Sequence, residues 1–323
     1  MKSTNLKKYD RLVVVVNTMR VWTGARILKD EDFRTLGYAE TSEEQRQVLK
    51  PGLKQIFDPD KLKIFEMLRV RARRLLEEAG VPFAKGFALP LDRADEILRK
   101  LDGIQDEFRS KVQDLIDHYD QDLEAWIHKN PGFETLLRQG SVAKEDLASR
   151  FEAGYLTMRI QPLRPEDEEK TEREVSSLSV KLLDEVSKDT TPMLVSMIGK
   201  PKCDGKCLRQ LEVIRNKLNG LSFLSSGILP VVDMLDRTLN QCPRGSAFGG
   251  YEFEMLKTCT SLLANRQLLE DLSNGKLSFE DEHEARMAAL GAQAPKPAVN
   301  LFTTAGGLDT NPAPHTESAR SWF

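Results

Sequence analysis

One stretch, residues 92–130, limits the fold more than any other part of the sequence. Its apolar residues recur at steps of three and four, the period of a helix that buries one side. They are Ile97, Leu101, Ile104, Phe108, Val112, Leu115, Tyr119, Leu123 and Trp126. Asp92 is suited to cap this helix, and Asn130–Pro131 should end it, because proline disfavours helix in the residue before it. We predict a single helix, roughly 55 Å long at about 1.5 Å per residue.

Similar apolar stripes predict several further helices. Asp58 and Pro59 suit the start of one that ends at Gly80, a residue typical of the position after a helix. The others span residues 133–139, 141–152 (capped by Ser141), 166–198 (ending or kinking at Thr191–Pro192), 208–221, 228–239, 253–272 and 279–290. The predicted fold class is therefore mainly α: long antiparallel amphipathic helices in a helical bundle or coiled-coil-like hairpins, with at most a minor β element.

Three short segments are candidates for other structure. Tyr155–Ile160 is expected to be a short extended piece. The β-branched run from Leu12 to Trp22 suits either a strand or the first turns of a buried helix, and we favour a helix that continues to Leu28. Residues 81–90 contain two prolines and a glycine and are expected to form a compact loop folded onto the core.

The clearest domain boundary lies at Pro162–Pro165, between the two groups of predicted helices. We predict an N-terminal helical unit over residues 1–162, built around helix 92–130, and a C-terminal long-helix hairpin region over residues 163–290. From residue 291 the hydrophobic period stops and Ala, Pro, Gly, Thr and Asn dominate. Residues 291–323 are expected to be a disordered tail, because they bury too little to offset the entropy of ordering.

Composition narrows the class of protein. Charged residues make up 30% of the 323 residues and the net charge is −3, so no overall positive charge favours nucleic-acid binding. No run approaches the about 18 apolar residues of a membrane span, and the apolar run near the N-terminus is too short for a signal peptide. Four cysteines in a chain of this length do not indicate a disulfide framework. We therefore expect a cytoplasmic protein without a membrane partner.

Cys203 and Cys207 are the nearest approach to a metal site. Their spacing loosely suits one pair of zinc ligands, but Cys242 and Cys259 are too far apart in the sequence to form the second pair. We treat Cys203 and Cys207 as weak candidates and expect ordinary buried or free thiols. No motif predicts a catalytic residue or a bound cofactor, so we expect a protein that is not an enzyme.

Four arginines crowd the second half of the helix that follows Pro59: Arg69, Arg71, Arg73 and Arg74. The plainer interpretation is a solvated helix face with cations near the negative end of the helix dipole. The alternative is a face that binds phosphate or an acidic partner. The aromatic residues that we expect to be structural are Trp22, Phe83, Phe87 and Trp126.

Several landmarks stand in a distinctive order along roughly residues 10–290. They are Trp22-Thr23-Gly24 with Arg26; Leu36-Gly37; Asp58-Pro59 with Leu62 and Phe65; Gly80-Val81-Pro82-Phe83 with Gly86 and Pro90; Tyr119-Asp120 with Trp126 and Asn130-Pro131; and Arg150-Phe151 leading to Arg159-Ile160-Gln161-Pro162. In this order and spacing the chain resembles DUF3150, a family of uncharacterised proteins of bacteriophages and mobile elements. The resemblance assigns no catalytic residue.

The resemblance does imply which genes lie near the gene for this protein. Members of such families are often encoded beside a MoxR/CobS-like AAA+ ATPase and a von Willebrand factor A (CobT-like) protein. Our first hypothesis is therefore a non-enzymatic, all-helical interaction protein of the bacterial cytoplasm that acts as an adaptor or client of such an ATPase. Under this hypothesis the protein can also form homo-oligomers. The second is a nucleic-acid-associated protein of element replication or recombination, which depends on the arginine-rich helix. An enzyme whose site is assembled from distant residues ranks last.

Overall fold

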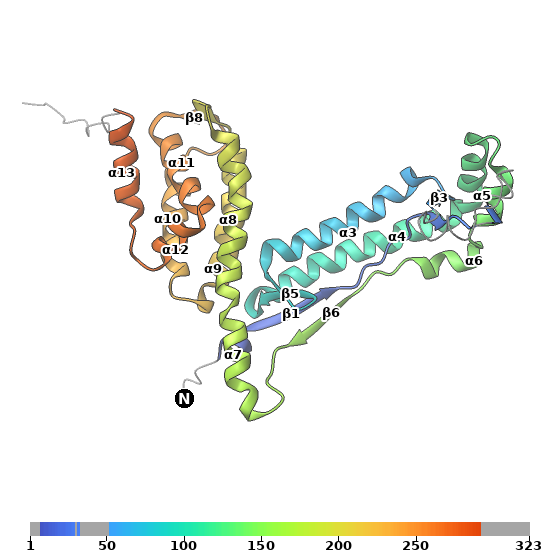
Figure 1. Cartoon of the computed structure of the whole chain (residues 1–323), viewed down its shortest axis with the longest axis horizontal. Coiled ribbons are helices and arrows are strands. Elements are labelled where there is room, and N and C mark those ends of the chain that lie inside the picture. Colours follow the sequence, from blue (N-terminus) through green and yellow to red (C-terminus); the bar gives the residue numbers. More distant parts are fainter. Residues whose placement is uncertain (1–6, 30, 33–51, 292–323) are drawn as a thin grey trace, which may run out of the picture.

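The computed structural model describes residues 7–29, 31–32 and 52–291. Figure 1 shows an elongated arm, which holds most of the first half of the chain, and a helical bundle formed by the second half. The landmark Leu36-Gly37 and the predicted tail from residue 292 onward lie outside the described residues. Helices predominate in the described part and strands are few, which confirms a fold that is mainly α with a minor β element.

The arm is built on an antiparallel pair of long helices, α3 (Pro59–Ala79) and α4 (Leu91–Lys129). α4 runs unbroken over the predicted segment. Its cap position is held by Pro90, whose side chain makes no capping hydrogen bond, so the predicted cap at Asp92 is wrong. Asp92 lies inside the first turn, where its carboxylate favours the positive end of the helix dipole.

The start of α3 is fixed by a capping hydrogen bond and its end by steric contact with the sheet. Asp58 caps the start as predicted, because its carboxylate accepts the backbone N–H of Asp60 at 2.9 Å. Gly80 follows the end, but in an extended conformation rather than the left-handed one typical of a glycine there. A Cβ at Gly80 would lie 2.4 Å from Leu89 Cδ2 and 2.6 Å from the Ala88 carbonyl oxygen. Residues 86–90, which form a strand of the sheet, therefore pass too close to this position for any side chain, and that is why a glycine is required here.

A four-stranded antiparallel sheet lies against the helix pair. Its order is β4 (Val81–Phe83), β5 (Gly86–Pro90), β1 (Leu12–Asn17) and β6 (Tyr155–Arg159). The helix expected from residue 12 to 28 is therefore wrong, and so is the loop expected at 81–90, which is the β4–β5 hairpin. The valine run is uniformly apolar because both faces of β1 are covered: Val13 and Val15 belong to the core of the arm, and Leu12 to the core of the bundle. The extended piece predicted at 155–160 is confirmed as β6.

The far tip of the arm carries short elements. They are β2 (Ala25–Ile27), β3 (Leu53–Gln55), α5 (Glu134–Gly140) and α6 (Lys144–Leu147). The helix predicted at 133–139 is confirmed as α5. The helix predicted from Ser141 to Glu152 is not formed as such, because Ala143 holds the cap position of α6 and a 3-10 turn replaces the rest.

The bundle begins after one 3-10 turn at Pro165–Asp167. Its helices are α7 (Glu168–Ser176), α8 (Leu178–Met197), α9 (Lys206–Gly220), α10 (Ile228–Gln241), α11 (Gly250–Ala264), α12 (Arg266–Ser273) and α13 (Phe279–Ala289), with a small hairpin of β7 (Lys202–Cys203) and β8 (Phe248–Gly249). Two predicted helices are each divided. The first is interrupted at Ser177, while α8 continues through Pro192. The second breaks at Asn265, whose side chain caps α12 by accepting two backbone N–H groups.

The described residues form two hydrophobic cores. One lies between the sheet, α3, α4 and the tip of the arm, and the other among helices α7–α13. Leu12, Val81 and Ala88 from the sheet belong to the core of the bundle, so the sheet is packed between both parts. The predicted boundary at 162–165 falls between β6 and α7. None of the described helices is both long and apolar enough to cross a membrane.

Candidate interaction surface

The structure divides the four predicted arginines between two sides of α3. Arg69 and Arg73 face the turn of the β4–β5 hairpin, whereas Arg71 and Arg74 lie toward α4, and Arg74 also borders the cleft between α3 and the bundle. Arg69 pairs with Glu66 at 2.8 Å, and Arg73 pairs with Glu77 on its own helix. They therefore do not form one cationic face.

The side of α3 that carries Arg74 has a second stripe of residues. Lys63, Met67, Val70, Arg74 and Glu78 recur along it at helical spacing, outside the buried stripe of the same helix. Met67 is 63% exposed and Val70 is 38% exposed. Adjoining exposed apolar side chains are a feature of interaction surfaces, whereas single ones are common on any protein.

This stripe forms one wall of a groove between α3 and α4, which we call the α3–α4 groove. Its apolar lining consists of Met67 and Val70 on this wall, together with Leu75, Gly103 and Ile104. Its charged border has four cations and two carboxylates: Lys63, Arg71, Arg74, Lys100, Glu66 and Glu78. These lining residues alone carry a net positive charge, but Lys63, Arg71 and Lys100 each pair with a carboxylate outside the lining.

The cations of the border differ in how they are held. Arg71 bridges the two helices to Glu107 at 2.9 Å, and Lys100 pairs with Glu96 at 2.6 Å. Arg74 makes no hydrogen bond or ion pair with the described part of the chain, so its guanidinium is the one best placed to bind a partner's carboxylate.

Gly103 lies in the middle of α4 at the floor of the groove. A glycine there weakens a helix by roughly 1 kcal/mol relative to alanine. A Cβ at Gly103 would have none of the described atoms within 4 Å. Packing inside the chain therefore does not explain this glycine, whereas a partner's backbone would come closest at such a position.

A second, polar cleft lies where the arm meets the bundle. Lys217 of α9 is buried at its floor and donates hydrogen bonds to the Glu77 carbonyl oxygen at 2.7 Å and to Glu185 at 2.8 Å. Burial raises the pKa of the Glu185 carboxyl, against the attraction of Lys217, and burial likewise raises the pKa of Asp189. The Lys217 ammonium thus joins the last turn of α3 to α8 and α9.

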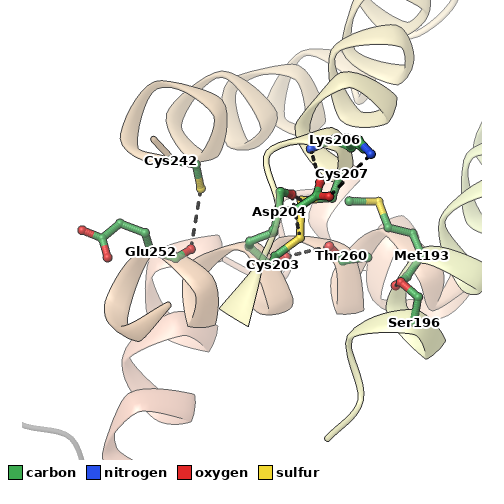
Figure 2. The surroundings of a disulfide bond; sticks show 10 residues. Met193, Ser196, Cys203, Asp204, Lys206, Cys207, Cys242, Glu252 and Thr260 are labelled. Carbon is green, nitrogen blue, oxygen red and sulfur yellow. Dashed lines mark hydrogen bonds and ion pairs between the residues drawn. A yellow bond between two sulfur atoms is a disulfide. The ribbon is translucent and has the colours of Figure 1, made fainter. Parts of the chain in front are cut away.

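The cysteines do not form a four-ligand site. Cys203 and Cys207 are joined by a disulfide, so the free thiols expected there are not found and neither sulfur is available to a metal (Figure 2). Figure 2 shows the Cys242 thiol pointing to the Glu252 carbonyl oxygen of α11, 3.6 Å away. Burial raises the pKa of Cys242 to about 11 and that of Cys259 to about 12, which keeps both as inert thiols. Within the described ranges no group of three or more His, Cys, Asp or Glu side chains could hold a metal ion.

The aromatic residues singled out from the sequence differ in burial. Trp22 is buried at the tip of the arm against Phe57 and Phe151, with ring centroids 5.5 and 6.4 Å away. Phe83 and Phe87 are partly buried, one against each core. The fourth, Trp126, is half-buried, and its indole N–H donates to the Gln55 carbonyl oxygen at 3.4 Å.

The apolar residues of the groove were not identified from the sequence as part of a binding surface. A signal was present, because Met67 and Val70 are apolar but fall off the buried stripe of α3. The buried cation Lys217 gave no such signal, since it looks in sequence like any lysine in a helix and is buried only because α3 and α8 meet there.

Comparison with known families decides what the chain is related to. The family model described as a protein of unknown function, DUF3150, matches residues 9–265. The chain belongs to the DUF3150 family. The match runs from Tyr9, a buried residue of the 3-10 turn just before β1, to Asn265 between α11 and α12, so it covers the arm and most of the bundle. Searches of curated proteins and of solved structures found no match to this DUF3150 protein.

Proposed function

We propose that this DUF3150 protein is a non-enzymatic interaction protein that holds a partner protein in the α3–α4 groove. The observation that carries the proposal is the exposed apolar lining of this groove within a basic border. Such a groove between two rigid helices gives apolar contact area at little cost in ordering, because both walls are already fixed by the core of the arm.

The chemistry of the groove favours an amphipathic helix with acidic flanks. An apolar stripe on such a helix would cover Met67 and Val70, and its carboxylates would meet Arg74 and the neighbouring cations. Gly103 lets the backbone of the docked helix come close to α4. An acidic amphipathic helix would therefore contact the exposed apolar residues, Arg74 and Gly103 of the groove.

For the source of this helix we propose a MoxR/CobS-like AAA+ ATPase, with this protein as its adaptor or client and a von Willebrand factor A (CobT-like) protein as a further partner. Support comes from the resemblance to a family of phage and mobile-element proteins, whose genes often lie beside those of such partners. The protein would then act in the cytoplasm of the bacterial host.

Binding of nucleic acid through the arginines is the alternative function. Arg69, Arg71 and Arg73 each pair with a glutamate, so a phosphate would have to displace an internal partner. The apolar lining of the groove offers carbon rather than phosphate ligands. These features favour a protein partner, and a salt-sensitive gel shift with duplex DNA would favour the alternative.

The test is co-purification with the AAA+ ATPase encoded beside the gene, in the presence of ATP. Met67→Glu and Arg74→Glu are expected to lower the affinity at least about tenfold, because each places negative charge opposite an acidic helix. Arg73→Glu is the matched control, since Arg73 lies on the other side of α3, and it should bind like the native chain. No binding by the native chain, or equal losses in Arg74→Glu and Arg73→Glu, would overturn the proposal.

A further inference from the structure

The two edges of the sheet are not alike. β4 is three residues long, contains Pro82, and places Val81 in the core of the bundle. A short strand with proline and a covering helix is a protected edge. β6 is five residues long and has no proline, and no described strand pairs with its outer side. Figure 1 shows β6 along the border of the arm.

The hydrogen-bonding pattern shows which groups of β6 face outward. Arg20 and Glu152 exchange both backbone hydrogen bonds, at 2.9 and 3.0 Å, in the same register as the β1–β6 pairing. Bonded pairs alternate along an antiparallel ladder, so Leu156 and Met158 bond to β1. The N–H and C=O groups of Tyr155, Thr157 and Arg159 therefore point away from the sheet.

The side chains beside this free edge are apolar and exposed. Leu156 is 58% exposed and Met158 is 47% exposed. Both lie on the same face of the sheet as their partners Val16 and Val14. A strand that extended the sheet beyond β6 would lengthen this apolar face and cover part of it.

We propose that β6 pairs antiparallel with β6 of a second copy of this chain, about a two-fold axis at Thr157. This register makes the strand complementary to itself. Leu156 of each copy faces Met158 of the other, Thr157 faces Thr157, and Tyr155 faces Arg159, so the like charges of the two Arg159 residues are kept apart. The two sheets become one continuous sheet. The α3–α4 groove takes no part in this pairing, so a test of the dimer does not depend on the proposed function.

The first experiment compares Thr157→Pro with Thr157→Val in the full chain. Proline removes an N–H that points outward, so it blocks edge pairing but leaves the β1–β6 hydrogen bonds intact. We expect light scattering after size exclusion to give about twice the 36.5 kDa chain mass for the native protein and for Thr157→Val, and the single mass for Thr157→Pro. A monomeric native chain at about 100 μM, well above the dissociation constants of stable dimers, or a Thr157→Pro variant that remains a dimer, would overturn the proposal.

The second experiment decides the matter if Thr157→Pro fails to fold. Directly opposed Cα atoms in a bonded antiparallel pair are about 5.5 Å apart, within the span of a disulfide. Thr157→Cys should therefore form a disulfide-linked dimer under mild oxidation, while the native chain, with its own four cysteines, should not. Absence of the Thr157→Cys dimer, or equal cross-linking of the native chain, would contradict the two-fold pairing.

Discussion

At the residue scale, the packing of Trp22 joins segments that are far apart in the sequence. Its ring contacts Phe57 before α3, Tyr119 on α4 and Phe151 before β6. Trp126, by contrast, lies at the border of the same tip and is only half-buried. The sequence suggested a structural role for both tryptophans, but their different burial depends on chain segments that only the fold brings together.

Replacing these two tryptophans should therefore have unequal effects. We expect Trp22→Ala to lower the free energy of unfolding by about 3–5 kcal/mol, the range for deleting a buried aromatic ring. Trp126→Ala is the matched control and should cost clearly less. Denaturant unfolding followed by circular dichroism measures both, and equal losses would contradict the burial of Trp22.

At the element scale, Gly80 at the end of α3 and Gly103 inside α4 are surrounded very differently. Gly80 has no room for a Cβ because the β5 backbone passes within 2.6 Å of that position. Gly103 has open space at the floor of the α3–α4 groove. We expect Gly80→Ala to destabilise the chain by about 1–3 kcal/mol and Gly103→Ala to stabilise it by roughly 1 kcal/mol. Thermal unfolding of both variants checks this, and a destabilised Gly103→Ala would mean that the site is not open.

The attachment of α13 should depend on pH through His283. This imidazole is buried, and its Nδ1 lies 3.2 Å from the Thr258 hydroxyl of α11. Burial, together with the Arg286 charge, lowers the pKa of His283, while Glu254 and Glu284 act in the opposite direction. The folded state thus binds fewer protons at this site than the unfolded state, so its stability is full above the unfolded pKa of about 6.5 and falls as the pH drops below it.

We therefore expect the amides of α13 to exchange hydrogen faster, relative to those of α10, as the pH is lowered from about 7.5 to about 5.5 once intrinsic exchange rates are divided out. His283→Leu should remove this difference, because leucine keeps the apolar contacts and does not titrate. The same pH dependence in the variant would show that another group is responsible.

Helices with long apolar stripes were predictable from the sequence, whereas the sheet was largely not. α3, α4, α9 and α10 follow their stripes closely. β1 is buried on both faces, so it lacks the alternation that separates a strand from a helix, and its partners come from residues 86–90 and 155–159. The division of the C-terminal helices at Ser177 and Asn265 depends on packing that a stripe does not record.

At the scale of the whole molecule, arm and bundle are joined through the sheet and through Lys217. Its ammonium binds Glu185 and the Glu77 carbonyl oxygen inside the junction. Removing it leaves a half-buried carboxylate without its cation, and the pKa of Glu185, already raised by burial, should rise further. A carboxyl with a raised folded pKa favours the folded state at acidic pH, and this contribution is lost as the pH rises through its unfolded and then its folded pKa.

Lys217→Met should therefore destabilise the chain by about 3 kcal/mol at about pH 8 and by less at about pH 5. The double variant Lys217→Met/Glu185→Gln should lose this pH dependence, because no carboxylate is left to be stranded. Lys100→Met, which removes an exposed pair with Glu96, serves as the control and should change stability little at either pH. Denaturant unfolding at the two pH values measures the difference, and a pH-independent loss in Lys217→Met would contradict the role given to Glu185.

The proposed function depends on one physical claim, that the α3–α4 groove of the arm holds a partner's acidic amphipathic helix. The most direct test is to place a photo-cross-linking amino acid at Met67, in the groove, and at Val180, an exposed apolar position on α8 outside it. With the AAA+ ATPase and ATP present, we predict that Met67 cross-links to an acidic amphipathic helix of the ATPase and that Val180 does not. Cross-linking to the bound ATPase from Val180 and not from Met67 would contradict the claim.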